Sequence, residues 1–192
     1  MCDILKYMSL QMRGGNELID PVKLLEHGGI RQGYVVADLG CGTVGHFVFP
    51  AAHMVGPQGK VYAVDILKSV LSAIESRRKL EGLDNVEAVW ADLEQPGALK
   101  IQDGSVDLTL LVNDLSQIPK RDVVLREATR ITKTGGTFIV ADWKLSASPL
   151  GPPPQKRLSP AEAKQLAQAA GFEYAGEFSA GPYHYGLIFR RK

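Results

Sequence analysis

A glycine-rich segment with an acidic residue beside it is the part of this sequence most suited to chemistry. The segment Asp38-Leu39-Gly40-Cys41-Gly42 follows a short apolar run. Glycines at positions 40 and 42 let a ligand approach the backbone where a side chain would collide with it. An anion beside the segment disfavours a pyrophosphate but favours a ligand that carries an ammonium group. Because Asp38 supplies that anion, the segment predicts a site for a positively charged ligand.

Two further acidic residues follow apolar runs later in the chain. Asp65 ends the run at residues 60–65, where a carboxylate can accept hydrogen bonds from both hydroxyls of a ribose. Asp92 follows the run at residues 86–90, where a carboxylate can accept from an adenine amino group. With the ammonium site at Asp38, these residues predict a ligand that contains an amino acid, a ribose and an adenine. S-adenosylmethionine has these three parts.

These residues require a scaffold that brings distant segments together. Apolar runs predict strands at residues 34–39, 60–65, 86–90, 106–112, 137–143, 172–178 and 183–190. Periodic apolar residues and turn signals predict helices at residues 44–55, 67–80, 119–131 and 159–170. Alternating strands and helices are typical of a parallel sheet with helices on both faces. We therefore expect a doubly wound α/β fold whose mostly parallel seven-stranded sheet ends in a C-terminal antiparallel hairpin.

The length and composition indicate a globular protein. The 192 residues are 45% hydrophobic and 22% charged, which is close to the average for globular domains. We expect a single domain over residues 1–192. It would consist of an N-terminal helical or lid segment (1–30), a cofactor-binding core (31–143), and a Pro-rich loop, last helix and hairpin (144–192).

The net charge indicates which kinds of partner the protein binds, and the cysteine spacing indicates its cellular compartment. Lysine and arginine number 22 against 21 acidic residues, which gives no support for binding to nucleic acid or to a membrane surface. Neither Cys2 nor Cys41 has a CxxC partner, so no metal site and no disulfide framework are expected. The N-terminus lacks a signal-peptide pattern, and no apolar stretch is long enough to cross a bilayer. We expect a cytoplasmic protein.

Four segments carry a resemblance to a known family. The segments VVADLGCG, VYAVDI, WADL and EATRITKTGGTFIVADW resemble those of class I S-adenosylmethionine-dependent methyltransferases, in particular the ubiquinone/menaquinone-biosynthesis-type and related type 11 group. The likeness covers roughly residues 16–192. It implies S-adenosylmethionine as the cofactor and residue roles that follow the family pattern.

The resemblance implies eight cofactor-binding residues along the predicted site edge. At the methionine end, Asp38 and Gly40 would line the site and Gly42 would let the backbone approach the cofactor. At the adenosine end, the family pattern implies that Asp65 holds the ribose, Ile66 packs on the adenine, Asp92 bonds the adenine amino group and Leu93 lies beside it. Asn113 falls where the family contacts both cofactor and substrate.

One feature departs from the family pattern and suggests an alternative. The third glycine of the loop stands at position 45, one residue later than usual, and Val44 takes its place. The glycines at 40, 42 and 45 thereby match GxGxxG, the dinucleotide fingerprint, with Asp65 as the ribose acid. Asp38, Asp92 and the closing hairpin weigh against a nicotinamide dinucleotide. We favour the methyltransferase interpretation and keep a dinucleotide-binding protein as an alternative.

Three residues are candidates for a catalytic role. Tyr183 and His184 open the last predicted strand near the expected pocket mouth, and His184 has the chemistry of a base because its reference pKa is near 6.5. His46, beside the glycine loop, is a second candidate base. Each histidine could equally have a structural role. Methyl transfer from a sulfonium is a direct displacement, so a base is needed only when the acceptor must lose a proton.

The acceptor is open at the level of sequence. The main hypothesis is an enzyme that methylates a small molecule, and protein side-chain methylation is the alternative. A non-catalytic cofactor-binding subunit within a homo- or hetero-oligomer is a further alternative. The segments at residues 8–16 and 145–157 are the expected lid and pocket segments, because loops and termini around such folds set specificity.

Overall fold

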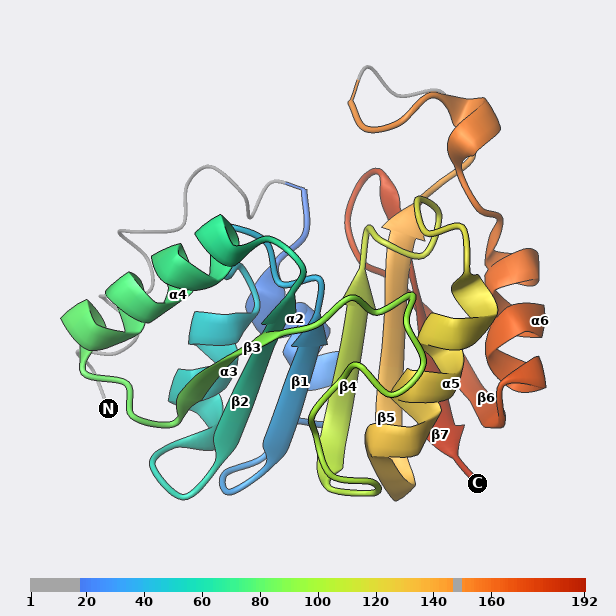
Figure 1. Cartoon of the computed structure of the whole chain (residues 1–192). Coiled ribbons are helices and arrows are strands. Elements are labelled where there is room, and N and C mark those ends of the chain that lie inside the picture. The colour runs from blue at the N-terminus through green and yellow to red at the C-terminus, as the bar shows by residue number, and fades with distance from the viewer. Residues whose placement is uncertain (1–17, 147–149) are drawn as a thin grey trace.

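The sheet of the computed structural model has the predicted mostly parallel topology, and the model describes residues 18–146 and 150–192. In those residues seven strands follow the order β3-β2-β1-β4-β5-β7-β6 (Figure 1). They are β1 (Val35–Leu39), β2 (Lys60–Asp65), β3 (Val86–Trp90), β4 (Val106–Val112), β5 (Thr132–Trp143), β6 (Phe172–Ser179) and β7 (His184–Arg191). Strands β1 to β5 are parallel, and β7 runs antiparallel to both β5 and β6. The predicted fold class and hairpin are confirmed.

Helices cover both faces of the sheet (Figure 1). One buried core joins the sheet to α2 (Pro21–His27), α3 (Val48–Val55) and α4 (Lys68–Glu81). The other joins the sheet to α5 (Arg121–Ile131) and α6 (Pro160–Ala169), which is preceded by the short helix η1 (Pro154–Lys156). Apolar burial on both faces is the main source of stability in such a sheet, and it leaves only the strand ends and loops free for ligands.

Local sequence signals set several helix ends. Ser159 caps α6 in a capping box, because its side chain accepts from the Glu162 backbone while the Glu162 carboxylate accepts from the Ser159 backbone. Gly82 ends α4 in the left-handed conformation, with φ 66°. These ends hold the helices at fixed positions on the sheet.

The helix after the glycine loop begins later than predicted. The sequence predicts it from Val44, but α3 begins at Val48, and the residues before it form turns. Gly45 causes the difference because it has φ 56°, and a Cβ atom there would lie 2.5 Å from the Phe49 ring and 2.7 Å from Ile74. The loop therefore needs its third glycine at position 45, where it packs against α3 and α4.

Of the two expected lid segments, the one at residues 145–157 contains described residues. Residues 8–16 lie outside the described residues. In the segment at residues 145–157, Arg157 is buried and its guanidinium donates to the carbonyl oxygens of Lys144, Ser146, Leu150 and Pro152. The guanidinium carbon also lies 5.6 Å from the centre of the Trp143 ring. Arg157 thus ties the described part of this loop to the end of β5.

Candidate functional site

The carboxyl ends of four parallel strands bring the predicted cofactor residues together. Because β4, β1, β2 and β3 are neighbours in the sheet, their carboxyl ends meet at one edge. Two cavities open there and share Gly40. The larger, about 290 Å³, is lined by residues that include Asp38, Gly42, His46, Phe47 and Asn113. The smaller, about 160 Å³, is lined by residues that include Asp65, Ile66, Asp92, Leu93 and Asp114.

Gly40 has no room for a side chain. Its φ is 79°, and a Cβ atom would lie 2.1 Å from Oδ2 of Asp114. The backbone N–H groups of Gly40 and Cys41 both donate to the Val64 carbonyl, at 2.9 and 3.0 Å, which fixes the loop against β2. Gly40 therefore presents only backbone atoms to the two cavities, as the sequence predicts for a residue in close contact with a ligand.

Asp65 links the glycine loop to the end of β2. Its carboxylate accepts from the Gly42 N–H at 3.2 Å and from the Leu67 N–H at 2.9 Å. An ionised carboxylate has about four acceptor positions, so lone pairs remain for ligand hydroxyls. Next to it, Ile66 is held by a hydrogen bond from the Trp90 indole to its carbonyl, at 2.8 Å, and its side chain remains half exposed. The smaller cavity thus combines a carboxylate that can accept hydrogen bonds from ribose hydroxyls with an apolar wall.

Three buried oxygen atoms around the two cavities have no partner among the described residues. Among the described residues, Asp38 Oδ2, Asn113 Oδ1 and Asp114 Oδ2 are buried without a hydrogen bond. Burying an unpaired polar atom costs free energy, so such atoms in a folded protein call for a partner. All three are acceptors when the carboxyl groups are ionised. The complementary ligand is one that brings N–H donors or positive charge.

Asn113, which lines the larger cavity, has a strained backbone conformation. In the described part of the chain it is the single non-glycine residue with positive φ, at 64°, and its N–H donates to the Ala141 carbonyl at 2.8 Å. Such a conformation is unfavourable for most residues but is tolerated by asparagine. It turns the chain sharply after β4 and places the Asn113 side chain in the larger cavity.

The electrostatics of the site are negative. Burial, reinforced by the nearby charge of Asp65, raises the pKa of Asp38 to about 7. Burial together with the charges of Asp38, Asp142 and Asp65 raises the pKa of Asp114 to about 8. Burial also raises the pKa of the Cys41 thiol, so this cysteine is not an activated nucleophile. A positively charged ligand would relieve the repulsion among these carboxyl groups.

The three catalytic candidates have different surroundings. His46 lines the larger cavity, and its Nε2 lies 2.8 Å from the Ile19 carbonyl, which leaves Nδ1 as the acceptor of the neutral ring. His184 is fully buried against Trp143, and burial, with the charges of Lys144 and Arg157, lowers its pKa to about 4. Neither Tyr183 nor His184 lines either cavity at Gly40. The catalytic roles of all three residues stay predictions.

Sequence reasoning missed Asp114, whose loop is held by Asp142. Asp142 is fully buried, and its carboxylate accepts from the backbone and hydroxyl of Ser116 and from the backbone of Trp143. It thereby holds the segment that follows β4. The signal for Asp114 was present, because two polar residues, Asn113 and Asp114, directly follow the apolar run of β4.

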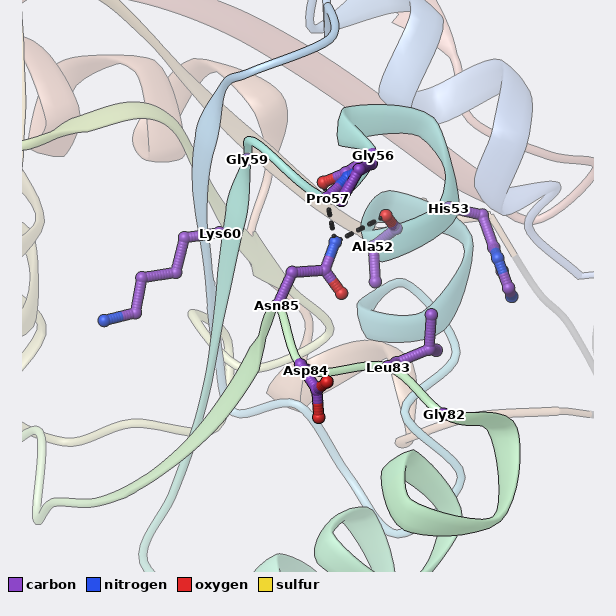
Figure 2. A pocket seen from close by; sticks show the side chains of 10 residues that line it. All are labelled: Ala52, His53, Gly56, Pro57, Gly59, Lys60, Gly82, Leu83, Asp84 and Asn85. Carbon is purple, nitrogen blue, oxygen red and sulfur yellow. Dashed lines mark hydrogen bonds between the residues drawn. The ribbon is translucent and has the colours of Figure 1, made fainter.

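A cavity at the opposite end of the sheet has a different character. It measures about 460 Å³ and lies between the C-terminal ends of α3 and α4 and the starts of β2 and β3 (Figure 2). The Asn85 amide donates to the carbonyl oxygens of Ala52 and Gly56, at 2.8 and 2.9 Å, as the dashed lines show. His53 lies 3.5 Å from Glu81 in an ion-pair arrangement. None of the predicted cofactor residues lines this cavity.

A comparison with family models decides the class. The family described as "Methyltransferase domain" matches residues 30–177, which include the glycine loop and all four strand ends of the site. The chain belongs to this methyltransferase family. Membership favours S-adenosylmethionine over the dinucleotide alternative and confirms the predicted class I family and its cofactor.

Individual relatives agree with the family match. A demethylmenaquinone methyltransferase from Geobacillus stearothermophilus is 34% identical over 110 residues, which cover 57% of this chain and 45% of that protein. A ubiquinone/menaquinone biosynthesis C-methyltransferase from Hahella chejuensis is 32% identical over 66% of this chain and 49% of that protein. The chain therefore spans about half the length of these relatives.

A solved structure matches this methyltransferase along nearly its whole length. The crystal structure of an S-adenosylmethionine-dependent methyltransferase from Aquifex aeolicus is 27% identical, covers 96% of both chains and superposes with a TM-score of 0.85. The buried acceptors around Gly40, the acid at Asp65 and the apolar Ile66 fit the chemical groups of S-adenosylmethionine. Among the described residues, no helix is long and apolar enough to span a bilayer.

Proposed function

We propose that this chain transfers a methyl group from S-adenosylmethionine to a small-molecule acceptor by direct displacement. The observation that carries the proposal is the set of unpartnered acceptors at Asp38, Asn113 and Asp114, next to a cavity that offers Asp65 and Asp92. A ligand with an ammonium group, a ribose and an adenine satisfies all of them. A pyrophosphate would place negative charge beside buried carboxyl groups, which is unfavourable.

Each residue of the site then has a defined task. Asp65 accepts from the ribose hydroxyls, and Asp92 accepts from the adenine amino group. Asp38 and Asn113 accept from the ammonium group of the methionine part. Ile66 and Leu93 line the smaller cavity and provide apolar contact for the adenine ring. When bound, S-adenosylmethionine supplies a methyl group that is already activated on a positively charged sulfur.

The protein's main contribution is to position the reactants and exclude water. Holding the nucleophile in line with the reacting carbon removes much of the entropic barrier. Where the acceptor is a hydroxyl or an enolic carbon, a base must take its proton. His46 is the base best placed for this, because it lines the larger cavity and Nδ1 is the acceptor of its neutral ring. For His184, an alanine variant with full turnover would assign it a structural role.

The walls of the larger cavity suggest the type of acceptor. Ile19, Val44, Phe47 and Val112 line it beside the polar residues, so an acceptor with an apolar body fits. The relatives are named for demethylmenaquinone and for ubiquinone and menaquinone biosynthesis, which supports an apolar ring as the acceptor class. Protein side-chain methylation remains the alternative. Cytoplasmic location and oligomeric state stay predictions.

The test is a calorimetric titration of the purified chain with S-adenosylmethionine, S-adenosylhomocysteine and NAD, followed by a methyl-transfer assay. We expect both sulfur nucleosides to bind and NAD not to bind. Asp84→Asn, at the opposite end of the sheet, serves as the control with unchanged affinities. Binding of NAD alone would overturn the proposal. With cofactor bound, methylation of a quinone precursor but not of a protein mixture would separate the two acceptor classes.

A further inference from the structure

Gly40 divides the site into two parts, and Asp114 lies at the division. Gly40 lines both cavities, with Asp38 and Asn113 in one and Asp65 and Asp92 in the other. Asp114 Oδ2 lies so close to the Gly40 backbone that a Cβ atom there would overlap it. The carboxyl group of Asp114 therefore stands at the boundary between the methionine side and the adenosine side.

The chemical order of the cofactor determines what lies at that boundary. If Asp65 and Asp92 take the ribose and adenine while Asp38 takes the ammonium group, the sulfur must lie between them, next to Gly40. The sulfur is positively charged in S-adenosylmethionine and neutral in S-adenosylhomocysteine. A carboxylate at this point distinguishes the two ligands by charge, whereas the ammonium group is common to both.

We propose that Asp114 is a specificity-determining residue that selects the methylated cofactor over its demethylated product through the positive charge on sulfur. The proposal rests on the proposed function. It gives the enzyme a means of releasing its product, because the charge that Asp114 attracts disappears when the methyl group is transferred.

Three other acidic residues of the site are already engaged, and Asp38, which also has an unpartnered oxygen, lies on the methionine side. Asp65 accepts from two backbone N–H groups, Asp92 from the Glu94 backbone, and Asp142 from Ser116 and Trp143. Oδ2 of Asp114 is buried and accepts from no described residue. Asp114 is thus the acid at the boundary with an unsatisfied oxygen.

Among the described residues, the charged groups that act on the pKa of Asp114 are all negative. They come from three different strands: Asp38 from β1, Asp65 from β2 and Asp142 from β5. Burial and these charges raise its pKa to about 8, so in the free protein near pH 6.5 the carboxyl group is mainly protonated. A cation bound beside it lowers that pKa and releases the proton. A neutral sulfur does not.

The decisive experiment measures dissociation constants for S-adenosylmethionine and S-adenosylhomocysteine with the wild type and two variants. Asp114→Asn keeps the shape and removes the charge. We expect it to weaken S-adenosylmethionine binding about tenfold, a typical change for one partly screened charge contact, and to change S-adenosylhomocysteine binding less than twofold. Asp38→Asn is the matched control and should weaken both ligands similarly, because both carry the ammonium group.

A second measurement uses the wild type and does not depend on the folding of a variant. Calorimetry at pH 6.5 in two buffers of different ionisation enthalpy counts the protons released on binding. S-adenosylmethionine should release more protons than S-adenosylhomocysteine, and Asp114→Asn should abolish the difference. Equal proton release by the two ligands would overturn the proposal.

The outcomes separate this proposal from the proposed function. Equal weakening of both ligands by Asp114→Asn would make Asp114 a general cofactor contact, and unchanged affinities would give it no role in binding. Either result overturns the charge selection while the methyltransferase proposal stands. If the wild type binds neither ligand, the proposed function fails, and the selection role of Asp114 fails with it.

Discussion

The two ends of the parallel sheet differ in how their polar groups are satisfied. The cavity of about 460 Å³, at the amino ends of β2 and β3, is lined by Asn85, whose amide donates to two carbonyl oxygens at the end of α3 (Figure 2). At the carboxyl ends, around Gly40, the cavities are smaller, and Asp38, Asn113 and Asp114 each have an unpartnered buried oxygen.

Under the proposed function the ligand site lies at the smaller cavities, so cavity size does not locate it. A cavity whose polar atoms bind one another is stable as it stands, because no desolvation cost remains to be offset. A cavity with unsatisfied acceptors and raised carboxyl pKa values keeps a free-energy cost until a ligand binds. Substitutions at matched positions of the two ends test this distinction.

The largest effect is expected from Gly40→Ala, with Gly82→Ala as its counterpart. Both glycines have positive φ, but a Cβ atom at position 40 meets Asp114, whereas one at position 82 meets nothing within 4 Å. Gly40→Ala should weaken S-adenosylmethionine at least about 100-fold, through backbone strain and overlap with the site.

Gly82→Ala is the control, because a Cβ atom at this position meets no other atom within 4 Å. Gly82→Ala should cost about 1 kcal/mol of unfolding free energy and leave cofactor affinity unchanged, as measured by urea unfolding and calorimetry. Similar affinities for both variants would mean that the Gly40 end is not the binding end.

The next effect is a pH dependence of stability in the cofactor-free protein. Asp38 and Asp114 have a reference pKa of 3.8, and the folded state raises these values to about 7 and about 8. The folded state thus binds more protons than the unfolded state between pH 4 and pH 8. The free energy of unfolding should therefore fall as the pH rises across that window.

Calorimetric melting at pH 5 and pH 8 measures this fall. Asp114→Asn should reduce it, and saturating S-adenosylmethionine should reduce it further, whereas Asp84→Asn, on the exposed loop at the other end, should leave it unchanged. If Asp84→Asn flattened the profile as much as Asp114→Asn, the buried carboxyl groups would not be its source.

A smaller effect is expected from Asp65→Ala. The change removes the acceptor proposed for the ribose and the contacts to the Gly42 and Leu67 N–H groups. Cofactor affinity should fall by about 1.5–3 kcal/mol, the usual range for a hydrogen bond to a charged group. Asp84→Ala, which changes an exposed carboxylate beside the other cavity, should have no effect on titration. An unchanged dissociation constant for Asp65→Ala would contradict the ribose assignment.

The smallest effect is expected from Asn85→Ala. The variant loses two hydrogen bonds at the end of α3 and should lower the unfolding free energy by about 1 kcal/mol. Because Asn85 lies at the opposite edge from Gly40, cofactor affinity should stay within twofold of the wild type. A large loss of affinity in a folded variant would give the Asn85 cavity a role in binding and would remove the contrast between the two ends.

Much of the fold was predictable because local signals agree with the tertiary structure. The strand at residues 60–65 occurs where predicted, and the helix predicted at residues 159–170 is present, with its start fixed by the capping box at Ser159. The start of α3 was not predictable from apolar spacing, because it depends on contacts of Gly45 with the Phe49 ring and with Ile74. Such contacts join residues of different helices and leave no periodic pattern in the sequence.

The sequence by itself determined the class of chemistry. The acidic residues 38, 65 and 92 follow apolar runs of a repeating strand–helix pattern, and parallel strands must end at one edge. Only the tertiary structure decided which polar groups remain unpaired. It placed the Asp114 carboxyl group against the Gly40 backbone and buried His184 against Trp143. It also gave the Asn85 amide its hydrogen-bond acceptors at the opposite end of the sheet. Burial and hydrogen bonding are properties of packed neighbours from distant segments, so the spacing of residues along the chain does not specify them.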